Sequence, residues 1–198
     1  MKQFKLDPQT YIGGWYIPKK VCDDLLLWRK KNKHREYTGK FGLCEGENRI
    51  LKENTDIKES LDIDITPNEL VKNTLTKPYG DYLQKCLEEY IKLYPDSNEI
   101  DRYTIYEPFI LQYYPVGGGY KKWHCECANK NVSNRVLVYM TYLNDVSDGG
   151  THFRMNDIIT PAEKGLTLIW PAYWPWHHKG QISQTCEKNI ITGWYGFV

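Results

Sequence analysis

Two residues that can bind a metal ion, His124 and Glu126, stand two positions apart after a predicted strand and a glycine-rich turn. Side chains alternate along an extended chain, so these two point to one face while Cys125 and Cys127 point to the other. An imidazole nitrogen and a carboxylate oxygen on one face can share a single ion. A further protein ligand must then come from elsewhere in the chain.

The candidate is one member of the pair His177 and His178, the latter 52 positions beyond Glu126 (178 − 126). Two histidines and one carboxylate on one side of an ion form the facial triad that is typical of non-haem Fe(II) oxygenases. The ion then keeps open positions for a cosubstrate and O₂. The residues alone do not decide which of the two histidines takes part.

Other interpretations of the His-x-Glu motif are weaker or excluded. On ligand chemistry alone, such a short motif is more often a surface pair than a metal site. Structural zinc normally requires a second close pair of Cys or His ligands beyond Cys125 and Cys127. The zinc deaminase signature requires a C-x-x-C motif, which occurs nowhere in the sequence.

A lysine, Lys188, follows His178 by ten positions (188 − 178) within a predicted strand. In one register, Lys188 shares a face with Ile190, Thr192 and Trp194. If that face is the interior of a β structure, the ammonium group needs an anion, and a dicarboxylate cosubstrate supplies one. In the other register Lys188 points to solvent, and the strand pattern leaves both open.

The elements that must position these residues change in type near residue 100. Before it, helical spacing of apolar residues predicts helices from Lys19 to roughly Lys33 and from Asp81 to Tyr94, and the alternation over Ser60–Pro67 predicts a strand. After it, β-branched and aromatic residues predict strands over Ile105–Tyr114, Arg135–Leu143, Gly165–Trp170 and Asn189–Val198. Turns are expected at 115–119, 144–150 and 163–165.

This order of elements favours a mainly β (α+β) fold, a sandwich or jelly roll with helices packed outside. The 198 residues fit one domain, in which 1–100 is a helical support region and 101–198 the core that carries the metal site.

Composition bounds the partners and the compartment. The 26 Lys+Arg residues nearly balance the 25 Asp+Glu residues, so nothing indicates nucleic acid or an anionic membrane. The apolar runs are far shorter than the roughly 20 residues of a membrane span, and the N-terminus has no apolar stretch of signal-peptide length. Six cysteines without an evident disulfide framework predict free thiols and a cytoplasmic location: Cys22, Cys44, Cys86, Cys125, Cys127 and Cys186.

Residues 103–198 resemble the prolyl 4-hydroxylase-like 2-oxoglutarate/Fe(II) dioxygenases, most of all the small members encoded by bacteriophages. Each motif alone is weak, but their order and spacing together are specific. They are YPVGGGYKKWHCE at 114–126, RVLVYMTYLND at 135–145, DGGTHF at 148–153, GLTLIWPAYW at 165–174, HKG at 178–180 and KNIITGWYGF at 188–197.

The resemblance implies a double-stranded β-helix, a jelly roll whose two sheets enclose the metal. It implies that His124 and Glu126 are the proximal ligands. It favours His178 over His177 as the distal ligand, because the family's distal histidine is followed by one residue and then a glycine, here Gly180. His177 should then face the opposite way.

The resemblance also implies the residues that bind the cosubstrate. Lys188 matches the basic residue that pairs with the far carboxylate of 2-oxoglutarate. Tyr114 and Tyr142 match tyrosines that hydrogen-bond the cosubstrate, and Thr192 and Trp194 match residues of the pocket wall. No catalytic residue is expected beyond the metal ligands.

One departure from the family concerns the carboxylate ligand, because many members have His-x-Asp where this chain has Glu126. A glutamate is one methylene longer but still a monoanionic oxygen ligand, so iron binding should survive. Related halogenases lack the carboxylate, so its presence here favours hydroxylation.

The resemblance thus predicts a dioxygenase that uses Fe(II), 2-oxoglutarate and O₂, with ascorbate as reductant, to hydroxylate a C–H bond, by default in a prolyl residue of a peptide or protein. Alternatives are the same chemistry on a small metabolite or nucleobase, and a catalytically silent jelly-roll binding domain. We expect a monomer or weak dimer in the cytoplasm, that of the host if the chain is phage-encoded.

Overall fold

The computed structural model describes residues 1–45 and 48–198, with the side chains of 43–45 and 48–50 left out. The C-terminal strand β16 (Lys188–Phe197) lies inside a large antiparallel sheet, here called the major sheet. Across it the strands are β1 (Lys2–Phe4), β2 (Gly13–Tyr16), β14 (Leu166–Pro171), β11 (Arg135–Tyr142), β16, β9 (Phe109–Tyr114), β7 (Leu61–Ile65) and β3 (Tyr37–Thr38), with β8 (Tyr103–Thr104) paired to the end of β16.

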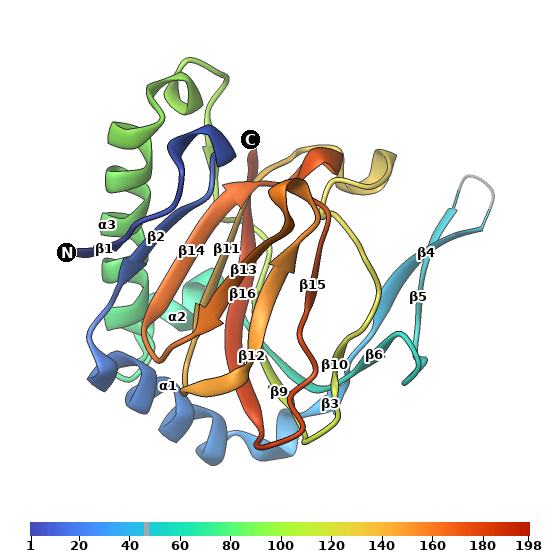
Figure 1. Ribbon diagram of the computed structural model, residues 1–198. Helices are drawn as coiled ribbons and strands as arrows, with labels where there is room; N and C mark the ends of the chain where they lie inside the picture. The colour runs from blue at the N-terminus through green and yellow to red at the C-terminus, as the bar shows by residue number, and fades with distance from the viewer. Residues whose placement is uncertain (46–47) are drawn as a thin grey trace.

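A smaller sheet faces the major sheet. It consists of β13 (Ile158–Ala162), β12 (Val146–Phe153) and β15 (His178–Gly180). Figure 1 shows these strands on one side of the major sheet and helix α3 on the other. Short strand pairs complete the β structure: β6 (Lys58–Glu59) with β10 (Gly119–Tyr120), and β4 (Phe41–Glu45) with β5 (Asn48–Lys52).

Two α-helices cover the outer face of the major sheet. The predicted helix 19–33 is α1 (Lys19–Lys31), and the predicted helix 81–94 is α3 (Lys77–Leu93), which starts earlier because Pro78 occupies its first turn. The unpredicted short helix α2 (Pro67–Lys72) begins with a capping box. Single 3₁₀ turns are η1 (Pro8–Thr10), η2 (Lys33–Arg35), η3 (Pro95–Asn98), η4 (Lys130–Val132), η5 (Met155–Asp157) and η6 (Trp174–Trp176).

Each face of the major sheet has its own core. On the helix side, Leu25 and Leu83 pack with Ile191. Between the two sheets, Val138 and Trp170 pack with Phe153. Burial of one such apolar side chain contributes about 1.5–3 kcal/mol to the stability of the fold. Successive residues of β11 and β16 pack alternately against the helices on one face and against the smaller sheet on the other.

The predicted strands after residue 100 are present with shifted ends. Residues 105–114 shorten to β9, 135–143 to β11, while 165–170 become β14 and 189–198 become β16. The turn predicted at 144–150 is wrong in part, because β12 starts at Val146. Its glycines are strand residues beside an irregularity in the pairing with β13, where a Cβ on Gly150 would collide with the carbonyl oxygen of Thr160.

The chain is mainly β with few helices, as predicted. The region 1–100, expected as helical support, also gives β1, β2, β3 and β7 to the major sheet. Five of the six cysteines are free, and the side chain of Cys44 lies outside the described residues. None of the helices in the described part of the chain combines the length and apolar character needed to span a bilayer.

Candidate metal centre

A single β-bridge brings His124 and His178 together. The His124 N–H donates to the His178 carbonyl at 3.0 Å, and the His178 N–H donates to the His124 carbonyl at 2.9 Å. Glu126, two positions beyond His124, points its carboxylate to the same side, as the alternation of side chains predicts. The ligand atoms of the three residues all lie within 4.8 Å of one another, so residues far apart in the sequence form one compact donor group.

Both imidazoles present Nε2 to this group. Nδ1 of His124 lies 2.9 Å from the carbonyl oxygen of Lys122, and Nδ1 of His178 lies 3.0 Å from that of Trp176. A carbonyl oxygen only accepts, so each Nδ1 carries a proton, and in the neutral form of each ring Nε2 keeps its lone pair. Burial, with the neighbouring His124, lowers the pKa of His178 to about 3 and keeps this imidazole neutral.

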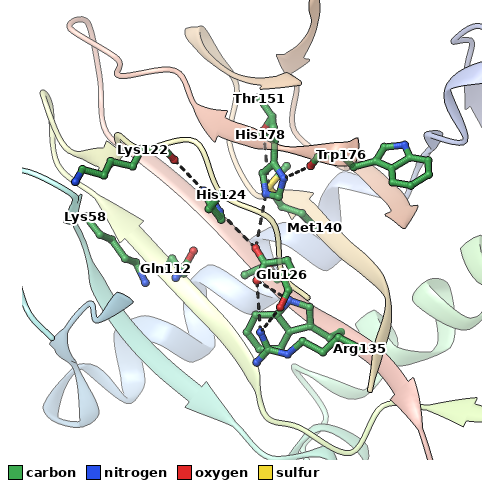
Figure 2. Close-up of polar contacts among 12 residues, drawn as sticks. Lys58, Gln112, Lys122, His124, Glu126, Arg135, Met140, Thr151, Trp176 and His178 are labelled. Carbon is green, nitrogen blue, oxygen red and sulfur yellow. Dashed lines mark hydrogen bonds and ion pairs between the residues drawn. The ribbon is translucent and has the colours of Figure 1, made fainter. Parts of the chain in front are cut away.

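The two oxygens of Glu126 have different surroundings. Oε1 lies 3.4 Å from Nε2 of His124 and 3.7 Å from Nε2 of His178. Oε2 accepts a hydrogen bond of 3.0 Å from the indole N–H of Trp194, and Arg135 lies 3.5 Å away (Figure 2). Burial alone would raise the pKa of Glu126, but the contact with His124 and the charge of Arg135 hold it below its usual range. The group therefore combines one anionic carboxylate with two imidazole nitrogens.

His177 does not join this group among the described residues. Its Nδ1 bonds to the carbonyl oxygen of Trp174, although the side chain also borders the cavity described next. Only the second of the two adjacent histidines therefore offers a nitrogen to His124 and Glu126.

A cavity of about 550 Å³ opens beside the three residues, between the two sheets. Alternate residues of three strands of the major sheet line it: Ile110, Gln112 and Tyr114 from β9, Val138, Met140 and Tyr142 from β11, and Lys188, Ile190, Thr192 and Trp194 from β16. The register that turns Lys188 inward is thus the one that forms.

Lys188 is a buried cation, with 4% of its surface exposed. Its Nζ donates to the carbonyl oxygens of Gly149 at 2.9 Å and Gln181 at 2.8 Å. Among the side chains that the structure describes, no carboxylate lies within ion-pairing distance of it. Burial lowers the pKa of Lys188 to about 8, and the charge of Asp148 opposes this shift. The ammonium group has capacity for an anionic partner.

The other residues predicted to bind the cosubstrate line the same cavity and have protein partners. The Tyr114 hydroxyl donates to Oε1 of Gln112 at 2.7 Å. The Tyr142 hydroxyl lies 2.6 Å from that of Thr151, and the Thr192 hydroxyl donates to the Tyr139 carbonyl at 2.9 Å. Each of these three hydroxyl groups thus has a hydrogen-bond partner within the protein.

Sequence reasoning missed several residues beside the metal group. The Tyr120 ring stacks on His124 with ring centres 3.7 Å apart. The Arg135 guanidinium lies 3.4 Å from the centre of the Trp194 ring and donates to Glu107 at 2.7 Å. Arg135 opens a predicted strand and Tyr120 follows the glycine turn, but no local pattern signals these contacts, which depend on packing between strands.

Comparison with known proteins agrees with this geometry. Residues 109–196 match the family model of the 2OG-Fe(II) oxygenase superfamily. A search of curated protein sequences finds no match.

Several solved structures are similar to the whole chain. The viral collagen prolyl hydroxylase of Paramecium Bursaria Chlorella virus-1, in complex with 2OG, has a TM-score of 0.68 at 16% identity and covers 95% of this chain and 97% of its own. A prolyl-4-hydroxylase of Pseudomonas putida has a TM-score of 0.68 at 13% identity and covers 96% of this chain and 94% of its own. A prolyl hydroxylase of Trichoplax adhaerens, in complex with a hypoxia inducible factor peptide fragment, has a TM-score of 0.71 at 14% identity. The match covers 94% of this chain and 84% of that chain.

At these identities the structures establish the fold alone. The chain therefore has the fold of these prolyl hydroxylases, and its residues 109–196 match the model of the 2OG-Fe(II) oxygenase superfamily.

Proposed function

We propose that this protein is an Fe(II)- and 2-oxoglutarate-dependent dioxygenase that hydroxylates a C–H bond, in a prolyl residue of a peptide or protein. The observation that carries the proposal is the convergence of two imidazole Nε2 atoms and one carboxylate oxygen beside a cavity that also holds a buried lysine.

The donor set fits Fe(II). His124, Glu126 and His178 would hold the ion, because two imidazole nitrogens and one carboxylate oxygen form the facial triad of this chemistry. When bound, iron and 2-oxoglutarate supply the activation of O₂ and the oxidation of the C–H bond, with release of succinate and CO₂. The hydrogen bonds from the histidines to the Lys122 and Trp176 carbonyls would fix both rings in the ligating tautomer.

Lys188 would orient the cosubstrate. Its ammonium group would pair with the far carboxylate of 2-oxoglutarate, which supplies the anion that the described surroundings of this buried cation lack. Tyr114 faces Lys188 across the β9–β16 ladder and would contact the same molecule. Tyr142, Thr192 and Trp194 would complete the pocket wall.

The fold is proposed as a double-stranded β-helix in one domain over residues 1–198, with residues 1–100 as its support and the helices outside. The two facing sheets with the metal group between them support this description. Ascorbate as reductant, a monomeric or weakly dimeric state and a cytoplasmic location, in the host if phage-encoded, belong to the same proposal; the five free thiols support the location.

A prolyl substrate is supported by the names of the similar structures, which are prolyl hydroxylases, one of them in complex with a peptide fragment. The test supplies Fe(II), 2-oxoglutarate and O₂ and measures succinate release, with a mass-spectrometric search for the gain of one oxygen atom in prolyl peptides. We expect both signals, and neither in His124→Ala. Absence of succinate would overturn the enzymatic proposal in favour of a silent binding domain. Succinate without peptide oxidation would overturn only the prolyl substrate and leave a small metabolite or nucleobase.

A further inference from the structure

A chain of buried polar side chains leads along the cavity wall to Tyr114. Nζ of Lys58 lies 2.6 Å from Oδ2 of Asp62, and the Ser60 hydroxyl donates to Oδ1 of Asp62 at 2.8 Å. Nε2 of Gln112 donates to Oδ2 of Asp62 at 3.1 Å, and the Tyr114 hydroxyl meets Oε1 of Gln112 at 2.7 Å. All five residues are buried, and four of them (Lys58, Asp62, Gln112 and Tyr114) line the cavity.

The strands place this chain beside the proposed cosubstrate site. Asp62 on β7 pairs with Gln112 on β9, and Tyr114 stands two residues further along the same face. Across the next ladder Tyr114 pairs with Lys188 on β16. Nζ of Lys188 lies 5.4 Å from the centre of the Tyr114 ring. The Tyr114 side chain therefore lies beside the ammonium group with which a carboxylate of the cosubstrate would pair.

The direction of every hydrogen bond in the chain is fixed by Asp62. An ionised carboxylate only accepts, so Gln112 must turn its amino group to Asp62 and its carbonyl oxygen to Tyr114. That oxygen also only accepts, so Tyr114 must be the donor. The single hydroxyl proton of Tyr114 is thus committed to Gln112, and the tyrosine turns only lone pairs toward the cavity.

A carboxylate or 2-oxo group of the cosubstrate also only accepts, so it cannot bond to Tyr114 while this proton is committed. We propose that Gln112 competes with 2-oxoglutarate for the Tyr114 hydroxyl and so lowers the affinity for the cosubstrate. This inference rests on the proposed function and adds Gln112, held by Asp62, as a positioning residue. When the Tyr114 hydroxyl donates its hydrogen bond to 2-oxoglutarate instead, the buried carbonyl oxygen of Gln112 loses its donor. The loss of this hydrogen bond opposes binding of the cosubstrate.

The test is calorimetric titration of 2-oxoglutarate into the Fe(II)-loaded protein without oxygen. Gln112→Leu and Gln112→Met remove the competing acceptor, so we expect binding about tenfold tighter than in the wild type, the order of one buried hydrogen bond. In a Tyr114→Phe background there is no hydroxyl to compete for, so Gln112→Leu should then leave the affinity unchanged.

Equal or weaker binding by the folded Gln112 variants, checked by circular dichroism, would overturn the inference. Such a result would mean that Gln112 helps Tyr114 to bind. If neither variant folds, Tyr114→Phe decides. In the proposed competition the bond gained with the cosubstrate replaces the bond lost with Gln112, so this variant should bind 2-oxoglutarate about as tightly as the wild type. A loss of affinity of about tenfold would overturn the inference. A wild type that binds no 2-oxoglutarate would instead remove the proposed function itself.

Discussion

The indole N–H of Trp194 donates a hydrogen bond of 3.0 Å to Oε2 of Glu126. The other oxygen of this carboxylate faces Nε2 of His124 and of His178. The Arg135 guanidinium lies 3.4 Å from the centre of the same indole ring and donates a hydrogen bond to Glu107. The C-terminal strand therefore fixes the rotation of a side chain that belongs to the proposed metal site.

We expect Trp194→Phe to lower the affinity for Fe(II) by about tenfold, because partners that orient a ligand typically contribute 10–100-fold to metal affinity. Phenylalanine keeps a ring under Arg135 but cannot donate to Glu126. Titration with Fe(II) under anaerobic conditions, or with Co(II) followed by its visible absorption, measures the change.

Trp174→Phe is the matched control for Trp194→Phe, because the Trp174 side chain is 72% exposed and lies outside the donor group. It should bind the metal as the wild type does. Unchanged affinity in Trp194→Phe would show that the longer glutamate holds its position without the indole.

The adjacent histidines give a second prediction. His178→Ala should abolish stoichiometric Fe(II) binding and succinate release, because it removes a buried neutral nitrogen that faces Glu126. His177→Ala should retain most of both, since its Nδ1 bonds to the Trp174 carbonyl outside the donor group. Metal content after dialysis, together with succinate release, measures the difference; equal loss in the two variants would remove the assignment of His178 as distal ligand.

How far the sequence predicts this site depends on the range of each contact. The placement of His124 and Glu126 on one face follows from local alternation, and the inward face of β16 follows from the same rule once its register is known. The bond from Trp194 to Glu126 spans 68 positions, and the Tyr142–Thr151 contact depends on how the two sheets face each other. A pattern of neighbouring residues cannot predict contacts of either kind.

The same limit applies to the fold. The helices α1 and α3 and the strands β9, β11, β14 and β16 have strong periodic patterns, so the sequence predicts them with small errors at the ends. Residues 146–150 of strand β12 fall within the turn predicted at 144–150, because the Asp-Gly-Gly segment has turn composition. Its glycines are explained by the close approach of Thr160 from β13, which only the paired structure reveals.

A third prediction concerns the pH dependence of cosubstrate binding. Burial lowers the pKa of Lys188 to about 8 in the free protein, with Asp148 opposing the shift. The ammonium form pairs with the dicarboxylate, so affinity for 2-oxoglutarate should be constant below about pH 8. Above that value it should fall by about tenfold per pH unit, because the lysine must first regain its proton. Binding raises the pKa of Lys188, so the fall levels off at the pKa of the complex.

Calorimetry between pH 6.5 and 9.5 measures this dependence, and Lys188→Arg is its control. A guanidinium group remains charged over the whole range, so the affinity of this variant, whatever its absolute value, should not fall above pH 8. A wild-type affinity that stays constant to pH 9.5 would mean that Lys188 does not pair with the cosubstrate.

The last prediction compares two ion pairs that both join a lysine to an aspartate four positions away. Lys58–Asp62 has side chains that are 5% and 2% exposed, whereas the side chains of Lys77–Asp81 are 56% and 58% exposed. Asp62→Ala leaves a buried ammonium without its counter-charge, so we expect it to lower the free energy of unfolding by about 3–5 kcal/mol.

Asp81→Ala should cost no more than about 0.5 kcal/mol, because water solvates both charges of an exposed helical pair. The double variant Lys58→Met/Asp62→Leu removes both buried charges and should recover much of the loss in Asp62→Ala. Urea denaturation of the four proteins measures these differences. If Asp62→Ala lowered the free energy of unfolding as little as Asp81→Ala does, water would have to reach Lys58. The carboxylate that orients Gln112 toward Tyr114 would then be solvated.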